Sequence, residues 1–270
     1  MKTLFAFFKK EWIGFVRTGH LTILLLLSAL FGIMNPAIAK LTPWLMKTMS
    51  SSLESSGIIV TEVTVDASVS WMQFYKNIPF ALLVFVLLFS SLFTREYQKG
   101  TLISVLTKGL SRWKVVAAKT ALMFFSWTAC YWLCFGITYG YNAYFWNNSI
   151  LSHLLFSAVC FWILGIWVLS LVLLFSAWAL NSTMVLAGTG GVFLGVYLIG
   201  LFPIFKNYMP VSLMNPTTLL TNNTSITSYY ITLFFTLLFT AISIVCSFFL
   251  LRRKKKTGAM TEFRHRTFFI

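Results

Sequence analysis

The side chains that could perform catalysis or hold a metal ion are few in this sequence. The acidic residues and histidines are Glu11, Glu54, Glu62, Asp66, Glu96, Glu262, His20, His153 and His265. None of the acids lies inside a long apolar run, and the histidines are not placed to form a cluster with them. Enzymes and metal sites need such groups brought together, so we predict no catalytic residue and no metal ion in this chain. The missing intramembrane carboxylate also argues against ion-coupled transport.

A phosphate-binding loop of the type GxxxxGK[ST] is missing from the sequence as well. If ATP drives this protein, ATP and its magnesium ion therefore bind to another chain. We predict no cofactor in this one.

The composition is that of a chain dissolved in lipid. It is 58% hydrophobic and 10% charged, with a mean hydropathy of +0.82, whereas soluble domains carry about 25% charged residues. About 20 apolar residues are needed to cross the hydrocarbon of a bilayer. Six runs meet or approach this length: 21–39, 78–93, 115–143, 152–179, 184–203 and 228–251. We predict an all-α integral membrane protein whose residues 1–270 form a single transmembrane domain.

The net charge of +15 indicates which side of the membrane each segment faces. The basic residues lie mostly between apolar runs, so they favour contact with an anionic bilayer surface over binding to nucleic acid. With the N-terminus in the cytoplasm, the Lys and Arg residues left outside are Lys40, Lys47, Lys76 and Lys206. The positive-inside rule therefore predicts that both termini are cytoplasmic. Residues 252–270 form a basic cytoplasmic tail in this topology.

Residues 1–20 are predicted to form an amphipathic helix in the cytoplasmic interface of the membrane. Leu4, Phe8, Trp12 and Phe15 recur at helical spacing on one face, and Glu11 lies among them. A soluble helix docked on a partner is the alternative.

Two longer polar stretches are predicted to be extracellular. Residues 41–77 carry three acids and a serine run, and we expect partial order there at best. Residues 204–227 contain Pro210 and Pro216 and follow Pro203, which favours short or re-entrant helices over a straight hairpin.

The cytoplasmic stretch 95–114 has the pattern of a short amphipathic helix lying parallel to the membrane. Gly100 breaks the preceding helix, and Thr101 can cap a new one. Its apolar stripe consists of Leu102, Val105 and Leu106. Such an element can fit a groove on a cytoplasmic protein and transmit its movement to the attached spans. Glu96 alternatively forms only a surface ion pair with Arg95 or Arg112.

This stretch resembles the pattern E-x-x-x-G-T-x-x-x-L-L-T-x-P-x-S-R of ABC-2-type permeases, the membrane subunits of type V exporters. The matching residues are Glu96, Gly100, Thr101, Leu106, Thr107, Ser111 and Arg112. Val105 replaces the first Leu of the pattern, and Gly109 replaces its Pro. Lys119 matches a Lys that often follows, and Asn215-Pro216 is similar to the family's N-P element. The segments Phe8–Trp12 and Phe31–Pro36 also resemble its first helix.

The resemblance implies a permease that pairs with a second copy, as a homodimer, or with a related permease. Each permease would receive an ABC ATPase subunit, two copies in all, through the segment 96–112, supported by Phe8, Glu11 and Trp12. The transport pathway would lie between the permeases, chiefly along the first, second and fifth spans. Its external gate would be formed by Pro203, Pro210, Asn215 and Pro216.

The cargo implied by the resemblance is a peptide, toxin or drug exported across a bacterial plasma membrane. Two other classes of function stay open. The chain could be a non-transporting immunity or sensor protein that binds a peptide with its outer loops. A membrane enzyme acting on lipid is disfavoured by the missing catalytic cluster.

Overall fold

The computed structural model describes residues 2–54, 65–98, 111–146, 148, 151–179, 181–220 and 226–266. Its long helices are α1 (Lys2–Arg17), α2 (His20–Glu54), α3 (Ala67–Gln98), α5 (Arg112–Phe145), α6 (Leu154–Trp178), α7 (Ser182–Gly200) and α9 (Ile226–Arg266). Three short elements, η2 (Lys206–Tyr208), η3 (Pro210–Met214) and α8 (Thr217–Leu220), connect α7 to α9. Within the described residues all regular structure is helical.

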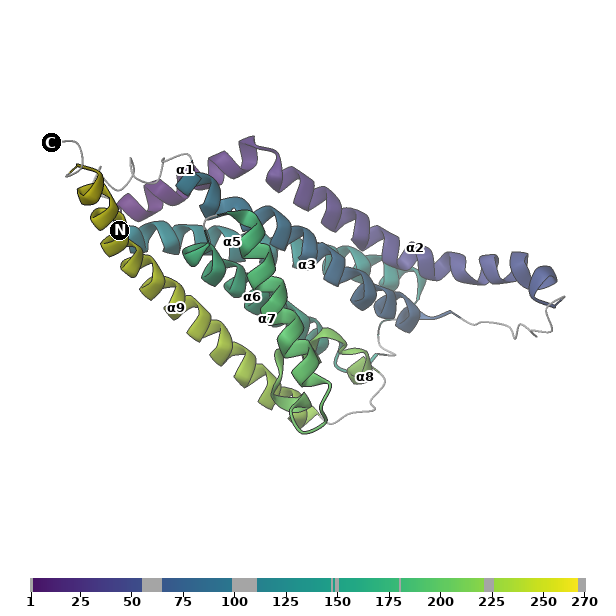
Figure 1. The fold of residues 1–270 in the computed structure, drawn as a ribbon. Helices are drawn as coiled ribbons and strands as arrows, with labels where there is room; N and C mark the ends of the chain where they lie inside the picture. The colour runs from purple at the N-terminus through teal and green to yellow at the C-terminus, as the bar shows by residue number, and fades with distance from the viewer. Residues whose placement is uncertain are drawn as a thin grey trace.

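Six of these helices are long and apolar enough to cross a bilayer. The candidate spans are His20–Leu45, Ala67–Ser91, Trp113–Phe145, Leu154–Trp178, Ser182–Gly200 and Tyr229–Leu250. The chain is therefore a multi-pass membrane protein, and the predicted all-α class is confirmed. The start of α1 and the end of α9 lie at one end of the helix bundle, called here the α1 end, while η2, η3 and α8 lie at the opposite end (Figure 1).

The predicted loop 41–77 is wrong over most of its length. Helix α2 continues to Glu54, and α3 already begins at Ala67, so the second span starts well before residue 78. The reason is an aromatic face on the first turns of α3. Trp71, Phe74 and Tyr75 are buried there, and the ring of Trp71 also packs on Phe135 of α5, with centroids 5.0 Å apart. Packing therefore continues the helix through a stretch whose average hydropathy is low.

At the other end of the chain, the helix α9 continues through most of the predicted basic tail, 252–270, and ends at Arg266.

Aromatic side chains fill the space between α3, α5 and α6. Phe85 meets Trp127 edge to face at 5.2 Å, and Tyr131 stacks on Phe161 at 6.2 Å between centroids. The polar groups of these rings make hydrogen bonds to the backbone. The Tyr131 hydroxyl donates to the carbonyl of Ala158 at 2.7 Å, and the Trp127 indole N–H donates to that of Trp162 at 3.1 Å. Buried Trp and Tyr side chains need such acceptors. Helix α6 is at the centre of this packing, and it is the most deeply buried of the six candidate spans.

Helix α9 packs mainly on α6. It presents a row of small hydroxyl residues that are nearly inaccessible to solvent: Thr232, Thr236, Thr240, Ser243 and Ser247. Four of these hydroxyls donate to the carbonyl four residues earlier in α9, at 2.7–2.8 Å. Small residues allow membrane helices to approach closely. The fifth hydroxyl, that of Thr232, donates to the Asn207 carbonyl of η2, so each donor in that row is paired.

A polar network joins α2, α3 and α5 inside the bundle. Pro36 lacks the N–H that would bond to the Gly32 carbonyl, and Thr138 of α5 donates to that carbonyl instead, at 3.1 Å. Asn77 of α3 donates to Asn35 of α2 at 2.8 Å, and Asn35 lies 3.5 Å from the Thr138 hydroxyl. The proline in α2 is thus compensated by a neighbouring helix.

We predict that Thr138→Val lowers the free energy of unfolding by about 0.6–2 kcal/mol, the range for hydrogen bonds between membrane helices. The matched control is Thr120→Val, because the Thr120 hydroxyl bonds to the Val116 carbonyl of its own helix. Unfolding of both purified variants in detergent measures the difference. Equal destabilisation by the two substitutions would contradict an interhelical role for Thr138.

Candidate functional site

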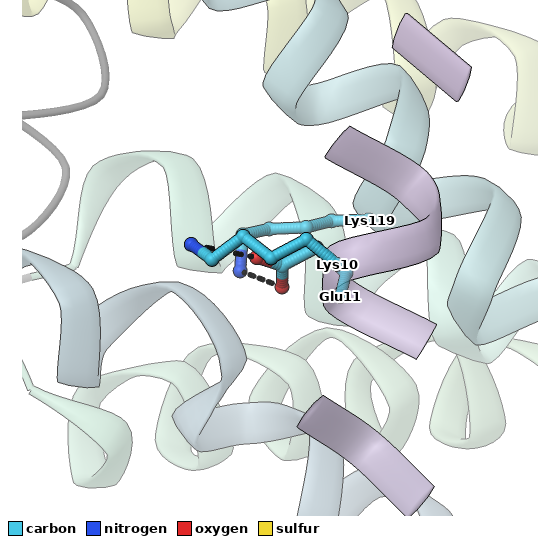
Figure 2. A network of polar contacts seen from close by, with 3 residues as sticks. All are labelled: Lys10, Glu11 and Lys119. Atoms are coloured by element: carbon cyan, nitrogen blue, oxygen red, sulfur yellow. Dashed lines mark hydrogen bonds and ion pairs between the residues drawn. The ribbon is translucent and has the colours of Figure 1, made fainter. Parts of the chain in front are cut away.

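A buried ion pair connects α1 to α5 at the α1 end of the bundle. The Lys119 ammonium lies 3.0 Å from Glu11 Oε2, and the two side chains are 1% and 10% exposed. Lys10 lies 3.8 Å from the other oxygen of Glu11 but is 64% exposed. Figure 2 shows Lys10 and Glu11 on α1 and Lys119 approaching from α5. One carboxylate therefore faces two ammonium groups, and only one of these is removed from solvent.

Apolar contacts on both sides of the ion pair hold α1 in place. Phe7 packs with Val115 and Ala118 of α5 in a small buried cluster. Trp12 meets Phe125 of α5 edge to face, with ring centroids 5.4 Å apart. These contacts exclude water from the pair, which makes its Coulomb attraction stronger than on a surface.

Two further contacts extend this attachment along α1. The Lys114 ammonium donates to the Thr3 hydroxyl at 2.9 Å, near the start of α1. Phe15, near its end, stacks on Phe89 of α3 with centroids 5.4 Å apart. We call the contacts of α1 with α5 and α3 the α1 junction.

The predicted amphipathic helix is present, and its predicted face is turned toward the chain's own bundle. Phe8 and Trp12 are partly buried against the core and Phe15 is fully buried. The opposite side of α1 leaves Phe5 and Ile13 exposed. An exposed apolar side suits the membrane interface, so docking on α5 and insertion into the interface are compatible.

The predicted coupling residues lie on and between α3 and α5. Glu96 is in the last turn of α3, and Arg112 is the first residue of α5. The others lie outside the described residues: Gly100, Thr101, Leu102, Val105 and Leu106. The amphipathic helix expected there therefore stays a prediction. After this segment the chain forms α5, which begins at Arg112. Lys114 and Lys119 of α5 then contact α1 in the α1 junction.

The predicted gate residues lie in or beside the cap formed by η2, η3 and α8. Pro210 begins η3 and is buried, and Pro216 is buried just before α8. Asn215 is exposed and lines a cavity of about 360 Å³ at this end, while Pro203 is exposed on the connection after α7. The expectation of short helices in 204–227 is confirmed.

Sequence reasoning did not find the contact between Glu11 and Lys119. A signal was present, because a lysine inside the predicted span 115–143 needs a compensating charge. Glu11 is an acid on the same predicted side of the membrane. The two residues are 108 positions apart, and only packing shows that they meet.

Metal chemistry has no visible support at this site. The described residues contain no group of three or more His, Cys, Asp or Glu side chains that could hold a metal ion. The α1 junction, with one carboxylate and two ammonium groups, can transmit force and fix the position of a helix.

Comparison with protein-family models, with curated proteins and with solved structures finds no match to this chain. Its function must therefore be argued from its own residues.

We predict that Glu11→Gln destabilises the protein by about 3–5 kcal/mol, because it leaves the buried ammonium of Lys119 without this carboxylate. Adding Lys119→Met should recover most of the loss, since the buried charge is then removed. Lys10→Gln, at the exposed ammonium, should cost less than about 1 kcal/mol. Thermal unfolding in detergent compares the variants. Equal effects of Glu11→Gln and Lys10→Gln would show that the buried pair is unimportant.

Proposed function

We propose that this chain is the membrane-spanning permease of an ATP-driven exporter of the ABC-2 type. The observation that carries the proposal is the buried pair between Glu11 and Lys119, at 3.0 Å. It attaches an N-terminal amphipathic helix to the first turns of α5, directly after the segment 96–112 that has the pattern of a coupling helix.

The α1 junction supports a mechanical role for this region. A force applied to residues 96–112 would act on the end of α3 and on the start of α5, because the backbone joins the segment to both helices. Movement of α5 displaces α1 too, since the ion pair and the Phe7 cluster connect them. The aromatic packing among α3, α5 and α6 then carries the displacement into the bundle.

In the proposed mechanism, a separate ATPase binds ATP and Mg²⁺ and pushes on this segment in each of two permeases. The cargo would be an amphipathic peptide, toxin or drug-like molecule leaving the cytoplasm or the inner leaflet. The spans of α2, α7 and α9 are largely exposed in the single chain, which leaves apolar surface for contact with a second permease. The cap of η2, η3 and α8 would control the outer exit.

The topology required by this mechanism can be tested by cysteine labelling. In a Cys246→Ser background, Lys108→Cys should react with a membrane-impermeant maleimide only after cells are opened. Asn207→Cys, in η2, should react in intact cells, because the proposed topology puts the two positions on opposite sides. Labelling of Lys108→Cys in intact cells would overturn both the topology and the ATPase contact.

The ATPase contact can be tested by purifying the tagged chain from its native cells and measuring any ABC-type ATPase that copurifies. Leu106→Asp should reduce the retained ATPase at least about tenfold, because a carboxylate replaces an apolar anchor residue. Leu106→Met keeps the apolar character and should retain the ATPase. Both variants must elute from size-exclusion chromatography like the wild type. Retention by Leu106→Asp, or no ATPase on the wild type, would contradict the proposal.

A further inference from the structure

A preformed cavity of about 360 Å³ lies at the end of the bundle opposite the α1 junction. Its walls come from the end of α7, from η2, η3 and α8, and from the start of α9, which meet at this end (Figure 1). The polar lining residues are Tyr197, Lys206, Asn207, Ser212, Asn215, Thr217, Tyr229 and Thr232. The volume is in the range of small-ligand sites.

Hydrogen bonds fix the walls of this cavity. Thr232 of α9 is 2% exposed, and its hydroxyl donates to the Asn207 carbonyl of η2 at 2.6 Å. The Ser212 hydroxyl of η3 donates to the Met209 carbonyl at 2.9 Å. At Gly200, an added Cβ would lie 3.6 Å from that of Met209, which is ordinary van der Waals contact between the end of α7 and the residue before η3. The cavity is therefore a built feature of the fold.

The lining favours an anion. Among the described residues that line the cavity, Lys206 is the charged one, and the lining contains no carboxylate. Asn207, Asn215 and Thr217 add amide and hydroxyl groups to the same lining. An ammonium group with several neutral donors is suited to bind a phosphate or carboxylate group.

An apolar surface leads along α7 to the cavity. Leu194, Leu198 and Leu201 are 61%, 58% and 63% exposed at helical spacing, and Phe202 follows them at 63%. Because α7 is a candidate span, this surface faces hydrocarbon or another membrane helix. Tyr197, on the cavity wall, has the ring type that is enriched at headgroup level. Polar donors and a cation therefore lie at the end of an apolar stripe.

We propose that this cavity binds the headgroup of a phospholipid, with the Lys206 ammonium against its phosphate and the acyl chains along the apolar surface of α7. Charge, size and position agree with such a ligand. The ligand comes from the leaflet at this end of the bundle. This site is independent of the ATPase contact proposed above, because it needs only the chain and the bilayer.

Native mass spectrometry of the full chain in detergent tests the proposal with a defined probe, phosphatidylglycerol. We expect the wild type to retain the lipid and Lys206→Gln to retain it about tenfold less, the effect of losing one hydrogen bond to a charged group. The matched control is Lys76→Gln, which removes an exposed lysine of α3 outside the cavity lining. That control should bind like the wild type.

Two further arms identify what the cavity recognises. Diacylglycerol with the same acyl chains should bind at least about tenfold less than phosphatidylglycerol, because it lacks the phosphate. Millimolar inorganic phosphate should not displace the lipid, because it lacks the chains. Equal binding by Lys206→Gln, or equal binding of diacylglycerol, would overturn the site. Displacement by inorganic phosphate would reduce it to a simple anion site and overturn the lipid assignment.

Discussion

A chain that crosses a bilayer must pair its polar groups within itself, because hydrocarbon offers them no partner. The strongest instance is Lys119, whose side chain is 1% exposed and whose ammonium lies 3.0 Å from Glu11. The carboxylate can reach it only if α1 folds back against α5. The ion pair thus helps to fix the position of the N-terminal helix, together with the apolar contacts of Phe7 and Trp12.

The same constraint explains several uncharged hydrogen bonds inside the bundle. The Gly32 carbonyl left free by Pro36 accepts a hydrogen bond from the Thr138 hydroxyl, and four hydroxyls along α9 bond to carbonyls of their own helix. Both solutions allow helices to come close without leaving a donor unpaired. Among the described residues, Ser70, Ser111, Ser176 and Thr189 each leave a buried hydroxyl without a hydrogen-bond partner, and Asn142, one turn beyond Thr138, leaves both polar atoms of its buried amide without one. The polar network in this part of the bundle is thus less complete beyond Thr138.

The sequence was sufficient to predict the helices but not all of their ends. Apolar runs mark the spans because length and hydropathy are local properties. The start of α3 was missed because polar residues such as Gln73 and Asn77 lower the average, while the helical spacing of Trp71 and Phe74 was the better signal. For the candidate site, periodicity predicted the α1 helix that carries Glu11. Its partner Lys119 could not be assigned, since that contact depends on how distant helices pack.

The two ends of the bundle each hold a lysine in a different setting. Lys119 at the α1 end is paired with a carboxylate, whereas Lys206 at the opposite end lines a cavity. At the α1 end, Lys119 is paired with Glu11 inside the protein, and this pair attaches α1 to α5. At the opposite end, Lys206 lines an accessible cavity whose described lining contains no acid. Helix α6 is largely buried between the two, whereas α7, which leads to the cavity, is mostly exposed. In the proposed permease, α7 is the span with the smallest buried share, so the bundle restrains it least, and a lipid bound beside Lys206 would favour one position of that helix.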